Sequence, residues 1–141
     1  MVRTLSINRL IVIACAAGFL FLAVDTLLEH IESFGPEPLS WVPVAFSVLG
    51  FAVVAVAALR WGERWVRLAH WCFLLALAVG ALGLVLHVAD RFESEEELVA
   101  EHGAAAKEHK PPPVLPPLSF CGLGVIGLIG TLRRWPAETR P

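Results

Sequence analysis

Apolar residues fall into four long runs along the chain, and polar segments separate the runs. The runs cover residues 10–29, 41–60, 66–88 and 115–133. A helix needs about 20 mostly apolar residues to cross roughly 30 Å of hydrocarbon, and each run meets or nearly meets that length. The pattern predicts an all-α, polytopic membrane protein whose residues 1–141 form a single membrane domain, a four-helix transmembrane bundle.

The polar segment 89–114 is the longest of the connections, and we expect it to be an external loop. Ser94 is followed by Glu95, Glu96 and Glu97, which is typical of the start of a helix. The triple proline 111–113 then favours a stiff, extended return to the membrane. The segment therefore predicts a short extracytoplasmic helix between the third and fourth spans.

Charge is divided unequally between the two sides of these spans. With the N-terminus in the cytoplasm, the cytoplasmic segments hold eight basic and two acidic residues, whereas the opposite side holds three basic and eleven acidic residues. Basic residues concentrate on the cytoplasmic side of membrane proteins. The distribution predicts that both termini are cytoplasmic and that the protein lies in a bacterial-type inner membrane.

Composition narrows the classes of partner. The chain is 57% hydrophobic and 17% charged, with a formal net charge of −2. Soluble domains have about 25% charged residues, and nucleic-acid binding requires a basic surface. We therefore expect the protein to lie in a lipid bilayer and not to bind nucleic acid.

Acidic residues and histidines near the outer ends of the first and third spans are the candidate chemistry. Asp25 lies inside the first apolar run, where an ionised carboxylate costs a few kcal/mol. Helical spacing favours a divalent-metal site (Zn, Fe or Mn) built from Asp25, Glu29, His87 and Asp90. His30 is left out of this set because it lies about 140° around the helix from Asp25.

Two alternatives use the same end of the protein. His30 and His87 end at the same height and are candidates for the axial pair of a haem b, although the first and third spans are diagonal in a simple up-and-down bundle. Asp25 and His87 are also candidates for a proton relay, or for lining a quinone or small-solute pocket. A purely structural interpretation stands beside these, since acids at the outer ends also follow from the charge asymmetry.

The chain contains no Cys-x-x-Cys, His-Glu-x-x-His or Glu-x-x-His motif, and no nucleophile–base arrangement is recognisable. An enzyme is therefore not favoured. The sequence predicts a small integral membrane protein that acts as a non-enzymatic accessory, assembly or complex subunit with an acidic, histidine-rich outer face. The alternative is a metal- or haem-binding redox membrane protein.

The fourth apolar run carries a stripe of glycines at Gly122, Gly124, Gly127 and Gly130. Glycine weakens a helix, so such a stripe in a membrane span usually marks a face that another backbone approaches closely. The stripe predicts packing either inside the bundle or against a partner, which is a larger membrane complex or a second copy of the chain.

Overall fold

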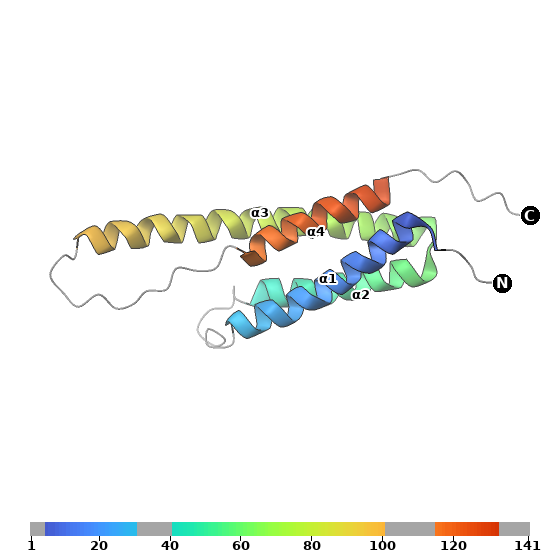
Figure 1. Cartoon of the computed structure of the whole chain (residues 1–141), viewed down its shortest axis with the longest axis horizontal. Coiled ribbons are helices and arrows are strands. Elements are labelled where there is room, and N and C mark those ends of the chain that lie inside the picture. The colour runs from blue at the N-terminus through green and yellow to red at the C-terminus, as the bar shows by residue number, and fades with distance from the viewer. Residues whose placement is uncertain (1–4, 31–40, 101–114, 133–141) are drawn as a thin grey trace, which may run out of the picture.

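The computed structural model describes residues 5–30, 41–100 and 115–132, without the side chains of residues 29, 30, 90, 91 and 93–100. These residues form four helices and no strand (Figure 1). The helices are α1 (Ile7–His30), α2 (Trp41–Arg60), α3 (Glu63–Ala100) and α4 (Leu115–Leu132). The prediction of an all-helical protein is confirmed for this part of the chain.

Each helix contains a stretch that is long and apolar enough to cross a membrane. The stretches are Ile7–Leu28, Trp41–Arg60, Glu63–Ala89 and Leu115–Leu132. A helix satisfies its own backbone hydrogen bonds, which a hydrocarbon environment requires of any spanning segment. The four stretches agree with the four apolar runs of the sequence.

The long third helix differs from the prediction. The sequence pattern placed a loop from residue 89 onward and a new helix near Ser94, whereas α3 continues without a break to Ala100. Neither glycine nor proline occurs between Gly83 and Gly103, so nothing breaks the helix where the apolar stretch ends. Ser94 is consequently an interior helical residue and not a cap. Residues 101–114, including the triple proline, lie outside the described residues.

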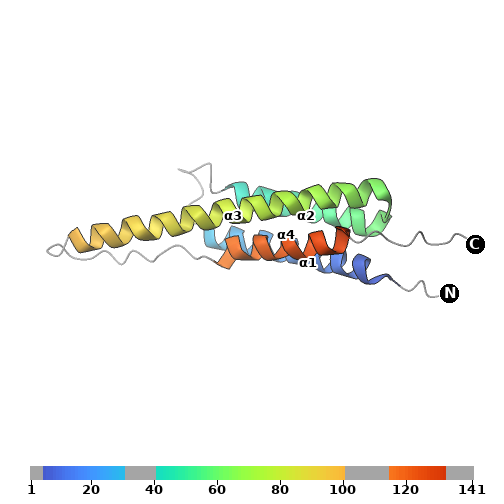
Figure 2. The ribbon, with the colours of Figure 1, turned by 90° about the horizontal axis from the view of Figure 1, so that it is seen from above.

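The helices form a bundle in which α1 and α3 stand on a diagonal. α1 packs on α2 and α4, and α3 packs on the same two helices (Figure 2). Consecutive helices run in opposite directions, because Arg9 near the start of α1 contacts Ala58 near the end of α2. A Cβ on Gly130 near the end of α4 would meet Ile11 of α1. The start of α1 and the end of α4 therefore lie at the same end of the bundle.

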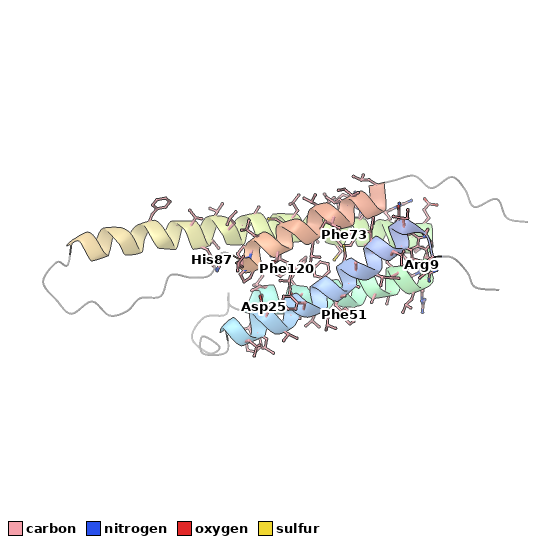
Figure 3. The ribbon with its side chains drawn as sticks, in the orientation of Figure 1. Arg9, Asp25, Phe51, Phe73, His87 and Phe120 are labelled. Atoms are coloured by element: carbon pink, nitrogen blue, oxygen red, sulfur yellow. The ribbon has the colours of Figure 1, made fainter. Side chains whose placement is uncertain are left out.

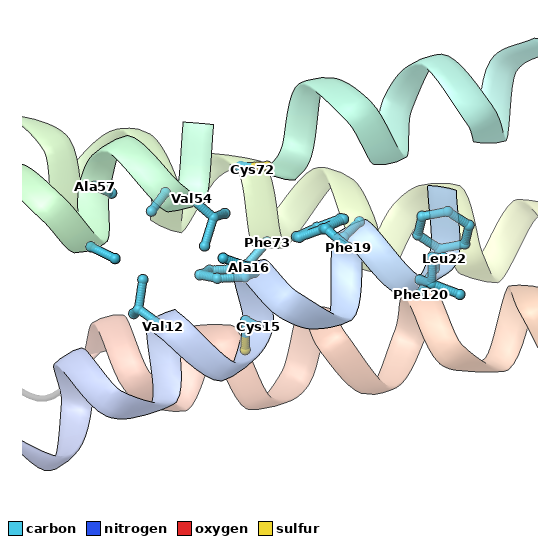
Figure 4. Close-up of a cluster of buried hydrophobic side chains, with 13 residues drawn as sticks. Val12, Cys15, Ala16, Phe19, Leu22, Val54, Ala57, Cys72, Phe73 and Phe120 are labelled. Atoms are coloured by element: carbon cyan, nitrogen blue, oxygen red, sulfur yellow. The ribbon is translucent and has the colours of Figure 1, made fainter. Parts of the chain in front are cut away.

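Each helix contributes one phenylalanine to a connected series of ring contacts, and three of these residues, Phe19, Phe73 and Phe120, are labelled in Figure 4. Phe19 of α1 stacks on Phe73 of α3 at 6.2 Å between ring centroids and meets Phe46 of α2 edge-on at 6.1 Å. Phe46 in turn lies 5.9 Å from Phe120 of α4. Such pairs add about 0.5–1.5 kcal/mol each beyond burial, so this cluster ties all four helices together.

Three of the four glycines in the predicted stripe face the interior of the bundle. A Cβ on Gly124 would lie 2.9 Å from the backbone nitrogen of Leu77 in α3, and one on Gly127 would enter the ring of Phe73. Gly130 lies against α1, whereas a Cβ on Gly122 would meet nothing within 4 Å. The interior alternative is therefore correct for these three positions. Because α3 and α1 occupy these three positions, only Gly122 of the stripe is open, and an association with a partner through this face stays a prediction.

A tight turn joins α2 to α3. Trp61 follows the last residue of α2 with a φ of +26°, and its backbone N–H donates to the carbonyl oxygen of Ala57 at 3.0 Å. A left-handed residue at this place ends a helix, and glycine is the usual occupant because it has no Cβ to clash. The first hydrogen bond of the next helix then runs from Val66 N–H to the oxygen of Gly62 at 2.9 Å.

Candidate functional site

Asp25 lies near the C-terminal end of α1, on the side of that helix that faces α4. It shares a helical row with Gly18 and Leu22, which precede it by seven and three residues. A Cβ on Gly18 would lie 2.6 Å from the side chain of Leu123 in α4, which fixes the direction of the row. Asp25 is half-buried, and it makes no hydrogen bond or ion pair with any residue that the structure describes.

His87 lies on the face of α3 that also packs against α4. It follows Gly80 and Gly83 on one row, and a Cβ on Gly80 would lie 2.7 Å from the carbonyl oxygen of Pro117. Nδ1 of His87 lies 2.9 Å from the carbonyl oxygen of Gly83. Because a carbonyl only accepts, Nδ1 carries the hydrogen, and in the neutral ring Nε2 keeps its lone pair.

The rows of Asp25 and His87 both face α4, and the first turn of α4 lies at the same end of the bundle as these two residues. α4 runs opposite to both α1 and α3, so its start lies at the level of Asp25 and His87 (Figure 3). Pro116 and Pro117 in this turn are buried. The positive end of the α4 dipole therefore lies at the same end of the bundle as Asp25. No hydrogen bond joins Asp25 to His87 in the described part of the chain.

The other predicted ligands fall where side chains are not described. Glu29 and His30 are the last two residues of α1, and Asp90 lies within α3 just after the apolar stretch. Among the described residues, no group of three or more His, Cys, Asp or Glu side chains is placed to hold a metal ion. The metal set Asp25, Glu29, His87 and Asp90 thus stays a prediction. The haem pair His30 and His87 also stays a prediction, on helices that stand across the diagonal.

At the opposite end of the bundle, Arg9 of α1 caps α2. Its Nε donates to the carbonyl oxygen of Ala58 at 2.7 Å and its terminal nitrogen to that of Leu59 at 3.2 Å. The last four carbonyls of a helix have no partner within the helix and form its negative end. The guanidinium satisfies two of them. No local pattern signals this contact, because the partners are 49 and 50 residues apart.

His70 makes a further polar contact between helices at this end of the bundle. Its Nδ1 lies 2.9 Å from the hydroxyl oxygen of Thr131 in α4. The Thr131 hydroxyl donates to the carbonyl oxygen of Gly127 at 3.0 Å, so it accepts the hydrogen of His70 Nδ1. This bond fixes α3 against α4, and it too joins residues that are far apart in the sequence.

Comparison with known protein families, with curated protein sequences and with solved structures found no match to this chain. The chemistry of the site therefore has to be argued from its own residues. These supply one half-buried carboxylate, one oriented imidazole and, beyond them, an acidic helical extension.

Proposed function

We propose that this protein is a non-enzymatic accessory or assembly subunit of a larger membrane complex and that the end of α3 is its docking element. The observation that carries the proposal is the length of α3. Its apolar stretch ends at Ala89, but the helix continues to Ala100. Residues 90–100 extend about 16 Å at 1.5 Å per residue, beyond the ends of the other helices (Figures 1 and 2).

The composition of this extension suits a basic partner. Residues 90–100 contain five acidic residues and one arginine. Phe92 on the same segment is 65% exposed. A helical segment of this length has little stability alone in water, and none of the other described helices reaches it. A membrane protein with a basic outer surface and an apolar recess for Phe92 would supply the missing contacts.

The orientation that we propose puts this acidic extension outside the cytoplasm. Arg9, Arg60, Arg64 and Arg67 gather where α2 meets α3, at the end opposite to the extension. Basic residues favour the cytoplasmic side, so this end faces the cytoplasm of a bacterial-type inner membrane, together with both termini.

Cysteine labelling tests the orientation. Ser94→Cys should react with a membrane-impermeant maleimide on intact cells, whereas Arg64→Cys should react only after the membrane is permeabilised. The unmodified protein serves as the control, because Cys15, Cys72 and Cys121 all lie within membrane-spanning stretches. The opposite labelling pattern contradicts the proposed orientation.

Size-exclusion chromatography of the protein, solubilised from its native membrane in mild detergent, tests the docking role. The unmodified protein should elute within a larger assembly. The triple variant Glu95→Gln, Glu96→Gln, Glu97→Gln should elute alone, because it lacks most of the charge of the extension. The matched triple Asp variant keeps that charge and should remain in the assembly. Elution of the unmodified protein as a monomer, or an unchanged elution of the Gln variant, contradicts the proposal.

The oriented imidazole of His87 favours a second candidate function, a metal- or haem-binding redox protein. Metal-ligating histidines generally donate their other ring N–H to a carbonyl or carboxylate, as His87 does to Gly83. Metal analysis and an optical spectrum of the purified protein should then show a stoichiometric divalent metal or a Soret band. Asp25→Asn and His87→Ala should lose it, and the matched control His70→Ala should retain it. Protein that contains neither rejects this function.

A further inference from the structure

The turn between α2 and α3 carries two arginines whose charge is not neutralised by any acid in the described part of the chain. Arg60 ends α2 and Arg64 lies in the first turn of α3, and both are exposed. The one acidic residue nearby, Glu63, is already paired with Arg67 at 2.7 Å. Arg64 is four positions after Arg60 in the sequence, so their Cα atoms lie within about 14 Å of each other.

Two tryptophans place these charges at the level of lipid headgroups. Trp61 and Trp65 are partly buried against the core, directly beside Arg60 and Arg64 in the sequence. The guanidinium carbon of Arg60 lies 5.2 Å from the centroid of the Trp65 ring. Tryptophan rings prefer the boundary between hydrocarbon and headgroups, so both arginines lie where lipid phosphates lie.

A continuous exposed row leads from this charge into the apolar part of α3. Arg64, Leu68, Trp71 and Leu75 follow one another at helical spacings of four, three and four residues. All four are exposed, Trp71 to 60%. The row spans about 16 Å from Arg64 to Leu75, close to half of a hydrocarbon core of about 30 Å. Arg64 is the one charged residue of the row and lies at its headgroup end, and the other three residues are apolar over the depth of about one leaflet.

We propose that this row binds one anionic phospholipid, with the phosphate at Arg64 and Arg60 and an acyl chain along Leu68, Trp71 and Leu75. Guanidinium groups pair with phosphate through two parallel hydrogen bonds, which an ammonium group does not offer. The apolar part of the row matches a lipid and not a soluble anion. This site lies at the opposite end of the bundle from the α3 extension and does not depend on the docking role.

Thermal unfolding of the purified protein in an uncharged detergent tests the site, with phosphatidylglycerol, phosphatidylcholine or inorganic phosphate added separately. A ligand that binds only the folded state raises the Tm with its concentration. We expect phosphatidylglycerol to raise the Tm and the other two additions to leave it unchanged. An equal rise with phosphatidylcholine overturns the charge requirement, and an equal rise with inorganic phosphate overturns the assignment to a lipid.

Variants locate the binding on the row. Each arginine near a membrane surface contributes about fivefold in affinity for an anionic lipid. The midpoint, which is the phosphatidylglycerol concentration that gives half of the full rise in Tm, should therefore increase about fivefold in Arg64→Gln and about 25-fold in the double variant Arg60→Gln with Arg64→Gln. Arg67→Gln removes the same charge from the same helix, but from a guanidinium that is already paired, and should shift the midpoint much less. Should the double variant fail to fold, Arg64→Gln alone decides, since Arg64 contacts no described partner through a hydrogen bond or ion pair. An unchanged midpoint in Arg64→Gln, or an equal shift in Arg67→Gln, overturns the proposal.

Discussion

Replacing Gly80 with alanine adds a methyl group where the backbones of α3 and α4 touch. The new Cβ would lie 2.7 Å from the carbonyl oxygen of Pro117 and 2.8 Å from the backbone nitrogen of Cys121. Both atoms belong to the backbone of α4, so neither can move away from the new methyl group unless the helix moves as a whole. The two helices must therefore separate by several tenths of an ångström, and they lose dispersion contacts along their interface.

The matched variant Gly122→Ala isolates the size of this effect. Gly122 also lies inside a helix, but a Cβ there would meet nothing within 4 Å. Both substitutions gain about 1 kcal/mol of helix propensity, and this gain cancels between them. What remains is the overpacking term, about 1–3 kcal/mol. We expect Gly80→Ala to be less stable than Gly122→Ala by this amount.

Unfolding in mixed micelles with increasing SDS, followed by far-UV circular dichroism, measures both free energies of unfolding. A double variant, Gly80→Ala with Gly124→Ala, should cost less than the sum of its parts, because either methyl group already separates the same two helices. Equal stability of Gly80→Ala and Gly122→Ala would refute the close contact of α3 with α4 and the interior position of the glycine face.

Three further predictions concern the end of the bundle where α2 meets α3. Arg9→Gln should lower the free energy of unfolding by about 1.5–3 kcal/mol, because two carbonyls at the end of α2 lose a charged donor. The control Arg64→Gln, measured in detergent without added lipid, should leave the free energy of unfolding unchanged. Equal effects of the two substitutions contradict the role of Arg9 as a cap of α2. In a double-mutant cycle with His70→Ala and Thr131→Val, the coupling energy should be about 0.5–1.5 kcal/mol, and additive losses argue against their hydrogen bond. Trp61→Gly should be more stable than Trp61→Ala by about 1 kcal/mol, because a residue with a Cβ is strained at the φ of +26°. Inside a helix alanine is the more stable of the two, so unfolding of both variants in SDS shows which order holds at this position.

The candidate site of Asp25 and His87 stays a prediction, and the sequence described only part of its surroundings. Helical spacing defined a face of α1 that holds Asp25 and a face of α3 that holds His87, and the two helices stand across the diagonal of the bundle. It did not indicate that both faces turn toward α4, whose first turn holds the buried Pro116 and Pro117. Spacing along one helix defines its own faces, but the rotation of each helix toward its neighbours depends on side chains from all of them.

The number of helices that are long and apolar enough to cross a membrane follows from the sequence alone, because a run of about 20 apolar residues is a local property and the backbone of such a run can satisfy its hydrogen bonds within the run in hydrocarbon only as a helix. Tertiary packing decided the rest. It turned three glycines of α4 inward, joined Arg9 to carbonyls 49 and 50 residues away, and brought one phenylalanine from each helix into contact. Those outcomes depend on how the surfaces of separate helices fit together, and only the folded bundle contains that information.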